Sequence, residues 1–249
     1  MSDIWTLLQA RKRGDPGAPL VTFVDGDRRE RVELSVTSLE NAAAKIANAL
    51  RSEYDLEPGS TVAAHVPVHW QRAAWCAGIW TAGCVLVLDE DPAADPAAPI
   101  DLTVSGPEEA VSLAAEDRSP LAVVSLHPFG LPIGEALPVG ADDATLTVRL
   151  QPDAYLFEPP DGLLPALRTP TLGGLSAAEV LDLAHQRAAA WGLTEGGVLL
   201  AGAGLDETDA WLAAIAVPVA LRASVVLTTG SIDEAAVVAA EHVSAIAGP

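Results

Sequence analysis

The chain has 249 residues, of which 50% are hydrophobic and 19% are charged. Such a composition can bury enough apolar surface to offset chain entropy, which excludes an intrinsically disordered polypeptide. Fourteen basic and thirty-four acidic residues give a net charge of −20. The long-range field therefore repels phosphate backbones and anionic membrane surfaces, and nucleic acid is not expected as a partner.

The N-terminal residues do not have the pattern of a secretory signal. Ser2 and Asp3 precede the apolar residues 4–10, and basic residues follow them, which reverses the order in a signal peptide. The longest uncharged run, 73–88, is shorter than the roughly 20 residues of a membrane-spanning helix, and Gly83 divides it. We therefore expect a cytoplasmic protein without a membrane segment.

Residues 1–88 predict a helix, a β-hairpin and then a helix–strand–helix–strand unit. Asp25-Gly26 supplies the hairpin turn, and Thr37 and Glu40 have capping-box spacing at the start of the second helix. The expected segments are the helix 4–12, the hairpin strands 20–24 and 31–34, the helix 37–54, the strand 61–66, the helix 69–82 and the strand 84–88. Cys76 and Cys84 are expected to be free buried thiols.

The same order of elements recurs near the end of the chain. Its expected segments are the helix 176–191, the strand 198–201, the helix 207–221 and the strand 225–228, and Trp75 and Trp211 hold corresponding places. We interpret this pattern as an internal repeat that forms two packed α/β subdomains.

Three segments lie between the repeats: the strands 100–104 and 121–126 and the helix 108–115. Residues 89–99 and 131–144 are expected to be loops rich in Pro, Gly and Ala. The stretch 158–174 contains four prolines and three glycines and is expected to be a mobile connection. The expected organisation is a first subdomain at 1–157, this connecting loop, and a second subdomain at 175–249.

Several of these residues resemble a known family. Leu56, Pro58, Gly59 and Val62 lie in a segment similar to the opening of adenylate-forming (AMP-binding, acyl-CoA-synthetase-like) enzymes, and residues 175–248 resemble their second subdomain. The chain also resembles an actinobacterial group that is distantly similar to AMP-binding enzymes. The resemblance implies an α/β fold with two similar layered subdomains, whose mostly parallel sheets are flanked by helices, as in the N-terminal domain of these enzymes.

The same resemblance places an ATP-binding loop before the helix 176–191. In the superfamily this loop is rich in Ser, Thr and Gly and ends in Pro-Lys-Gly. Here the place reads Arg168, Thr169, Pro170, Thr171, Leu172, Gly173, Gly174, without the lysine. Backbone N–H groups could still hold an anion, so Arg168, Thr169, Thr171, Gly173 and Gly174 are candidate ligand-binding residues. Triphosphate binding normally recruits fixed cations and a metal, so ATP is not expected here.

Other family features are also missing from this sequence. An adenine-contacting aromatic motif, an acidic ribose-binding motif and a domain with a catalytic lysine would follow Pro249. The only lysines are Lys12 and Lys45, on early helices. We therefore assign no catalytic residue and no cofactor.

Two further motifs have simpler interpretations. Gly202 and Gly204 suggest a dinucleotide fingerprint, but Glu207 occupies the third glycine position, which favours helix capping. His65 and His69 have the i, i+4 spacing of a metal pair, but Pro67 prevents one helical turn from presenting both side chains. No metal is expected.

The loop after the strand 121–126 is the other candidate site. His127, Phe129 and Gly130 leave the C-terminal end of an apolar strand, where open α/β sheets usually bind ligands. These residues are candidate contacts for a small molecule, and the alternative is a packed loop.

The sequence favours a non-catalytic, degenerate relative of adenylate-forming enzymes. Its expected ligand is a protein partner or a small acyl-like or nucleotide-like molecule. The alternative is an enzyme, either a split adenylating half completed in trans or an ATP-independent activity in the same cleft. Because later segments of the full-length relatives would cover apolar surface here, we also expect a homodimer or a protein partner.

Overall fold

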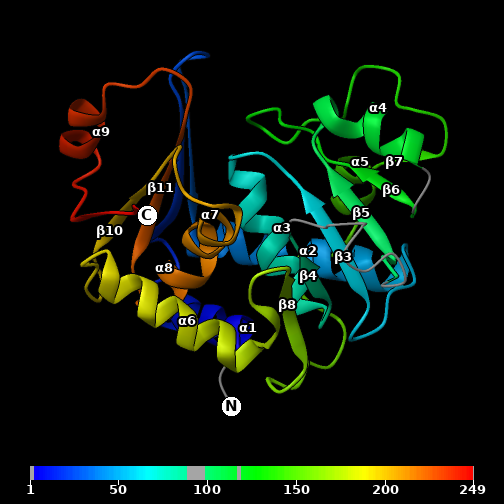
Figure 1. The fold of residues 1–249 in the computed structure, drawn as a ribbon, viewed down its shortest axis with the longest axis horizontal. Helices are drawn as coiled ribbons and strands as arrows, with labels where there is room; N and C mark the ends of the chain where they lie inside the picture. The colour runs from blue at the N-terminus through cyan, green and yellow to red at the C-terminus, as the bar shows by residue number, and fades with distance from the viewer. Residues whose placement is uncertain (1–2, 89–98, 117–118, 249) are drawn as a thin grey trace.

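The computed structural model describes residues 3–88, 99–116 and 119–248. These residues form two sheets with a layer of helices between them (Figure 1). Within these residues, no helix is long and apolar enough to cross a membrane. The sequence predicts a loop at 89–99, and residues 89–98 of it lie outside the described residues.

Both sheets are mainly parallel, as expected. The five-stranded sheet has the order β12 (Ala245–Ile246), β10 (Val198–Ala201), β11 (Ser224–Thr229), β1 (Pro19–Asp25), β2 (Glu30–Ser35). The seven-stranded sheet has the order β7 (Ala141–Asp143), β6 (Leu121–Val123), β5 (Leu102–Ser105), β3 (Thr61–His65), β4 (Val85–Val87), β8 (Pro165–Thr169), β9 (Gly173–Ser176). The hairpin pairs β1–β2 and β8–β9 are antiparallel, and the other pairs are parallel.

The helices are α1 (Ile4–Gly14), α2 (Val36–Ser52), α3 (Trp70–Thr81), α4 (Pro107–Glu116), α5 (Ala144–Arg149), α6 (Ala177–Ala190), α7 (Glu207–Trp211), the π-helix η1 (Leu212–Ala216), α8 (Val217–Ala220) and α9 (Glu234–Ala240). Helices α2 and α3 pack against each other; α2 contacts β1 and β2, and α3 contacts β1 of one sheet and β4 of the other. Helices α4 and α9 lie on the outer sides of the two sheets (Figure 1). The core therefore sits between the sheets.

The internal repeat is confirmed in the order of its elements. The first unit is α2–β3–α3–β4, and the second is α6–β10–(α7, η1, α8)–β11. A hairpin precedes each unit, β1–β2 before α2 and β8–β9 before α6. Each hairpin joins the sheet of the other unit: β1 pairs with β11 and β8 pairs with β4. The two repeats therefore complete each other's sheets.

The expected connecting loop at 158–174 contains β8 and the start of β9, which is a correction to the sequence analysis. The strand is stable because Leu167 is buried and the indole N–H of Trp80 donates to the carbonyl of Ala166 at 2.7 Å. Pro165 is the first residue of the strand, a position where proline is tolerated. The division into subdomains at 157 and 175 stays a prediction.

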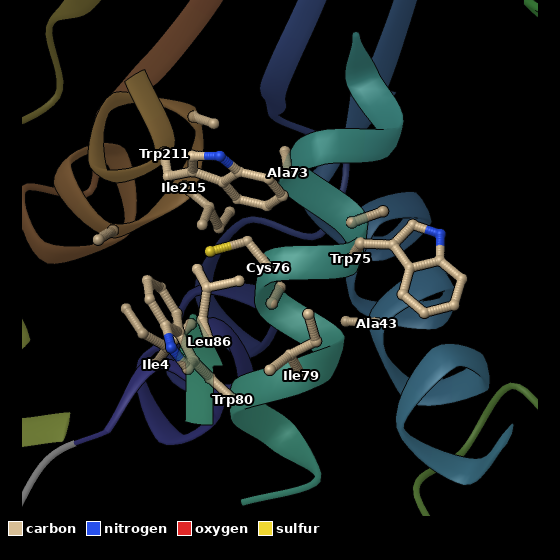
Figure 2. Packing of buried hydrophobic residues seen from close by; sticks show 14 of the residues in the cluster. Ile4, Ala43, Ala73, Trp75, Cys76, Ile79, Trp80, Leu86, Trp211 and Ile215 are labelled. Atoms are coloured by element: carbon tan, nitrogen blue, oxygen red, sulfur yellow. The ribbon is translucent and has the colours of Figure 1, made fainter. Parts of the chain in front are cut away.

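One large hydrophobic cluster fills the space between the sheets, with α3 at its centre (Figure 2). Trp75, Ile79 and Trp211 are all nearly inaccessible to solvent. Burying a side chain of this size contributes about 1.5–3 kcal/mol. At Gly78 a Cβ would lie 2.5 Å from the Ile46 side chain, so the missing side chain lets α2 and α3 approach closely. Both cysteines, as expected, are free and buried.

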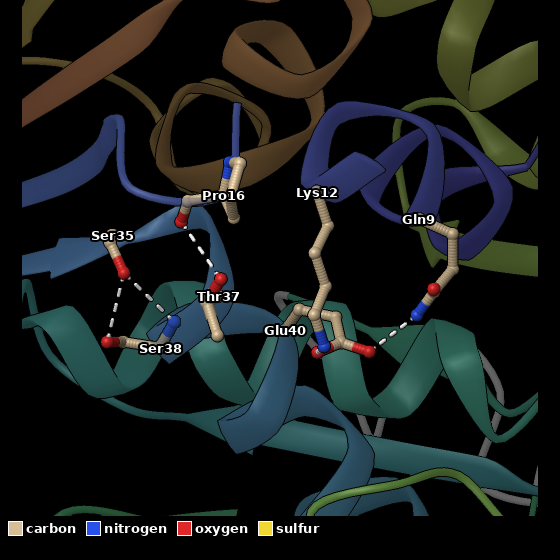
Figure 3. Close-up of polar contacts among 7 residues, drawn as sticks. All are labelled: Gln9, Lys12, Pro16, Ser35, Thr37, Ser38 and Glu40. Atoms are coloured by element: carbon tan, nitrogen blue, oxygen red, sulfur yellow. Dashed lines mark hydrogen bonds and ion pairs between the residues drawn. The ribbon is translucent and has the colours of Figure 1, made fainter. Parts of the chain in front are cut away.

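The N-terminus of α2 differs from the expected capping box. Ser35 is the N-cap, and its hydroxyl accepts from the backbone N–H of Ser38 at 3.2 Å (Figure 3). Thr37 instead donates its hydroxyl to the carbonyl of Pro16 at 2.9 Å. Glu40 is buried and pairs with Lys12 of α1. The two residues that sequence spacing assigned to the cap are therefore used in tertiary contacts, Glu40 with α1 and Thr37 with Pro16 in the segment that follows α1.

The expected helix 207–221 is continuous but contains a π-helical turn. The backbone N–H of Val217 donates to the carbonyl of Leu212, five residues earlier. Pro218 lacks an N–H, and its ring would collide with the carbonyl of Ala214 in a regular α-helix. The hydrogen-bond register shifts at this point for that reason.

Candidate functional site

The turn between β8 and β9 occupies the place of the expected ATP loop. The hydroxyl of Thr169 accepts from the backbone N–H of Leu172 at 3.0 Å and lies 3.3 Å from the hydroxyl of Thr171. Gly173 has φ of +68°, which favours glycine at the end of this tight turn. The hydroxyls of Thr169 and Thr171 and the N–H of Leu172 therefore have their hydrogen-bond partners inside the turn.

The exposure of the candidate residues in this turn varies. Thr169 is buried, Arg168 is half-buried, and Thr171, Gly173 and Gly174 are exposed. Both lysines of the chain are engaged elsewhere. Lys12 pairs with Glu40, and Lys45 lies 2.9 Å from a carboxylate oxygen of Asp153. Arg168 is therefore the one basic residue in the hairpin formed by residues 165–176.

The second candidate, the loop at His127, borders a surface hollow of about 290 Å³. We call it the α2–α5 hollow, because α2, α3, α5 and this loop form its walls. Its main lining residues are Lys45, Ile46, Trp70, Trp75, Phe129 and Arg149. Gly130 also lines it. Two of the three loop residues selected from the sequence therefore face the hollow.

His127 holds the loop in shape. Its Nδ1 accepts from the backbone N–H of Phe129 at 3.1 Å, and its backbone carbonyl accepts from the N–H of Gly130 at 2.8 Å. Because Nδ1 is an acceptor, the neutral ring carries its proton on Nε2. Phe129 is left 83% exposed at the edge of the hollow.

A segment beside the hollow is held against α2 by a buried amide. Asn48, 1% exposed, donates to the carbonyls of Pro152 and Ala154 at 3.2 and 2.8 Å, and accepts from the N–H of Leu156 at 3.1 Å. Lys45 donates to the carbonyl of Gln151 at 2.6 Å. The α2 helix therefore positions the chain that follows α5.

The two candidate sites are separate. Strands β6 and β8 are parallel, so the loop after β6 and the turn after β8 leave the same edge of the sheet. Strands β5, β3 and β4 lie between them. Four strand spacings of about 4.8 Å place their starting points about 19 Å apart. The structure therefore does not bring the two sets of predicted residues together.

A buried polar cluster between the repeats was missed by the sequence analysis. Arg72 is 5% exposed, and its Nε donates to the carbonyl of Val66 at 2.8 Å. Its Nη2 lies 3.3 Å from Glu207 Oε1, and its guanidinium lies 4.9 Å from the ring centre of Trp211. Burial lowers the pKa of Arg72. An arginine next to the long uncharged run 73–88 was the available sequence signal.

His69 belongs to the same region and is 2% exposed. Its Nδ1 accepts from the N–H of Gln71 at 3.2 Å, which caps α3, and its ring meets the edge of Phe23 at 4.6 Å between centroids. Burial, followed by the nearby Arg28, lowers the pKa of His69 to about 4. The imidazole is therefore neutral at pH 7.

The remaining motifs are located as follows. His65 faces Glu109 at 3.8 Å, whereas His69 packs on Phe23, so the two histidines do not form a pair. Across 3–88, 99–116 and 119–248, no group of three potential ligand side chains could hold a metal ion. The capping interpretation of 202–209 is confirmed, because Asp206 accepts from the N–H of Asp209 at 2.8 Å.

The architecture defines a class of fold, that of the N-terminal half of adenylate-forming enzymes. An acyl-CoA synthetase from Brucella canis matches with a TM-score of 0.79 and 18% identity over 98% of this chain and 47% of its own. A fatty acyl CoA synthetase from Mycobacterium tuberculosis matches with a TM-score of 0.68 and 15% identity, over 97% of this chain and 48% of its own. An acetoacetyl-CoA synthetase from Streptomyces lividans matches with a TM-score of 0.72 and 14% identity, over 92% of this chain and 38% of its own. The chain spans less than half the length of these enzymes.

A relative with a similar amino-acid sequence shows the family to which the chain belongs. A TIGR03089 family protein from Mycobacterium tuberculosis strain H37Rv is 37% identical over 214 residues, which are 84% of each chain. The chain belongs to the TIGR03089 family. No protein-family model matches it.

Proposed function

We propose that the protein is a non-catalytic relative of adenylate-forming enzymes, which binds a ligand but does not activate it with ATP. The observation that carries this proposal is the closed turn at residues 169–173, where Thr169 bonds the N–H of Leu172. A loop that wraps a triphosphate needs open N–H groups and cations directed at the phosphates. Here Arg168 is the basic residue of the hairpin.

The charge of the whole chain supports the same conclusion. ATP with bound magnesium is anionic, and a protein of net charge −20 repels it at long range. Lys12 and Lys45 lie on α1 and α2 and are paired with carboxylates. Neither lysine supplies the missing charge at the turn.

The ligand, in this proposal, occupies the α2–α5 hollow. The hollow lies beside the C-terminal end of β6, and open α/β sheets bind ligands outside such strand ends. It combines aromatic walls with a few polar side chains, which is the usual composition of small-molecule sites. The expected homodimer stays a prediction, which light scattering at micromolar concentration can test.

The experiment is a thermal-shift titration with ATP and magnesium, together with pyrophosphate exchange over a panel of carboxylic acids. We expect neither a shift nor exchange. A ligand at a hundred times its dissociation constant stabilises by about 2.7 kcal/mol, so binding would be readily visible. The fatty acyl CoA synthetase of Mycobacterium tuberculosis is the positive control. A shift of several degrees with millimolar ATP, or any acid-dependent exchange, contradicts the proposal.

A further inference from the structure

We infer that the α2–α5 hollow binds a flat aromatic molecule that carries one anionic group. The inference rests on the proposed function, because it names the class of ligand for the same hollow. Aromatic walls and the positive charge of Arg149 at the rim support it.

The walls are suited to a planar ring. Trp70 is half-buried and Trp75 is 1% exposed, and both line the hollow together with Ile46. Gly130 leaves the Trp70 ring uncovered: a Cβ there would lie 3.6 Å from the ring, so a larger side chain would cover it. Phe129 stands 83% exposed at the edge. Offset and edge-to-face contacts with such rings add about 0.5–1.5 kcal/mol beyond burial.

Positive charge gathers at the rim of this apolar surface. Lys45 and Arg149 both line the hollow in a chain of net charge −20. Lys45 is paired with Asp153, but Arg149 is exposed and pairs with none of the residues that the structure describes. Helix α5 has only six residues, so its dipole gives a weak reason for a cation at its end.

The two carboxylates that precede α5 accept hydrogen bonds from neutral groups and form no ion pair with Arg149 among the described residues. Asp143 accepts from the N–H groups of Ile133, Thr145 and Leu146. Asp142 accepts from the hydroxyls of Tyr54 and Thr147 at 2.6 and 2.8 Å. An anionic group on a ligand is therefore the natural partner for the Arg149 guanidinium.

Two polar groups in the wall also need a partner. The indole N–H of Trp70 is buried without an acceptor among the described residues. Gln71, 6% exposed, reaches the carbonyl of Ser125 only at 3.5 Å, which is long for a hydrogen bond. A buried donor without an acceptor costs about 1–3 kcal/mol, but the Trp70 indole nitrogen is itself closed to solvent, so a ligand in the hollow would reach it only if the half-buried indole turned.

The volume limits the size of the ligand. About 290 Å³ is just below the usual range of small-molecule sites, which is roughly 300–1,000 Å³. One or two fused rings fit this space, and a whole dinucleotide does not. An aromatic carboxylate and an aromatic phosphate monoester share the required chemistry, and the experiment separates them.

The test is calorimetric titration of the full chain with naphthoate, naphthyl phosphate and the neutral naphthylmethanol. We expect saturable binding of at least one anion and at least tenfold weaker binding of the neutral alcohol. The stronger of the two anions identifies the source of the negative charge. Equal binding of the alcohol, or no binding of either anion, overturns the inference.

Two variants with matched controls locate the binding. Arg149→Gln should weaken anion binding about tenfold, the effect of losing one hydrogen bond to a charged group, and Arg13→Gln on an exposed part of α1 should stay within about twofold. Ala42→Leu should fill the hollow and weaken binding, whereas Ala189→Leu on exposed α6 should not. Anion binding that survives both hollow variants overturns the inference.

The outcome is separable from that of the proposed function. ATP with magnesium is titrated into the wild type and the Ala42→Leu variant alongside the naphthyl probes. An ATP-dependent shift in both proteins contradicts the non-catalytic proposal without affecting the result for the hollow. If neither naphthoate nor naphthyl phosphate binds, and ATP also causes no shift, the result contradicts only the inferred class of ligand and leaves the non-catalytic proposal in place.

Discussion

The guanidinium of Arg72 on α3 lies 3.3 Å from the carboxylate of Glu207 on α7, and it covers the ring of Trp211. Figure 2 shows Trp211 lying against α3 beside Ala73. This ion pair joins the two repeats at a place where Arg72 is almost inaccessible to water. Glu207 also accepts from the indole N–H of Trp211 at 2.6 Å, so one carboxylate orders both neighbours.

Removal of this carboxylate should destabilise the protein strongly. Glu207→Ala leaves a buried cation unpaired, and we expect a loss of about 3 kcal/mol in the free energy of unfolding, measured by urea denaturation. The control is Glu195→Ala, which removes an exposed partner of Arg222 and should cost less than about 1 kcal/mol. The double variant Arg72→Met/Glu207→Leu should recover part of the loss. Equal losses of stability in Glu207→Ala and Glu195→Ala would contradict a stabilising role for the buried Arg72–Glu207 pair.

The neutral His69 should make stability depend on pH. Its folded-state pKa of about 4 is below the ordinary value of 6.5, so only the unfolded chain gains this proton as pH falls between these values. The contribution is complete above pH 6.5, decreases toward pH 4 and then levels off, a change of about 3 kcal/mol.

His69→Asn tests this dependence, because asparagine can still cap α3. The difference in unfolding free energy between wild type and variant should change through the window from pH 6.5 to 4. Gln186→Asn, on an exposed position of α6, removes no titratable group and should show no such change. A constant difference for His69→Asn across the window would show that this histidine is not buried in its neutral form.

Asn48 should control the segment 151–156 beside the hollow. Asn48→Ala removes three hydrogen bonds, and we expect a loss of about 2–3 kcal/mol and faster amide exchange at Leu156. Asn41→Ala, on the same helix, makes none of these contacts and is the control. Unchanged exchange in the Asn48 variant would contradict this role.

The exchanged hairpins predict that the halves depend on each other. Separate fragments 1–157 and 158–249 lose the pairings β1–β11 and β4–β8, which leaves strand edges unpaired. We expect one cooperative unfolding transition for the whole chain and none for either fragment alone, measured by calorimetry. A fragment that unfolds cooperatively by itself would instead support independent subdomains.

Local patterns were sufficient to locate most helices and strands and the repeated unit. The segments 37–54 and 69–82 have strong helical periodicity, and the structure has α2 and α3 there. The proline-rich hairpin β8–β9 was missed because Pro165 and Pro170 resemble loop residues in a local window. Helix α5 was missed because a six-residue element carries little periodicity.

The candidate site could be predicted only in part. Phe129 and Gly130 were selected because they follow the C-terminal end of a strand, and both line the hollow, whereas their role as ligand contacts stays a prediction. Lys45 and Arg149 were not found, because they lie on different helices that meet only in the folded protein. Surface helices also carry cations for ordinary solvation, so their sequence positions contain no signal of a shared site.

The family resemblance implied the mostly parallel sheets, and the lack of a secretory pattern favoured free buried thiols. Periodicity and composition determine which face of each element is buried, and together with the order of the elements they made the repeat evident before the fold was known. They do not determine which sheet accepts a strand, since pairing depends on contacts between residues far apart in the chain. Only the tertiary structure decided that β1 joins β11 and that β8 joins β4. It also decided the partner of Arg72, because a buried charge is stabilised by whichever carboxylate packing brings beside it.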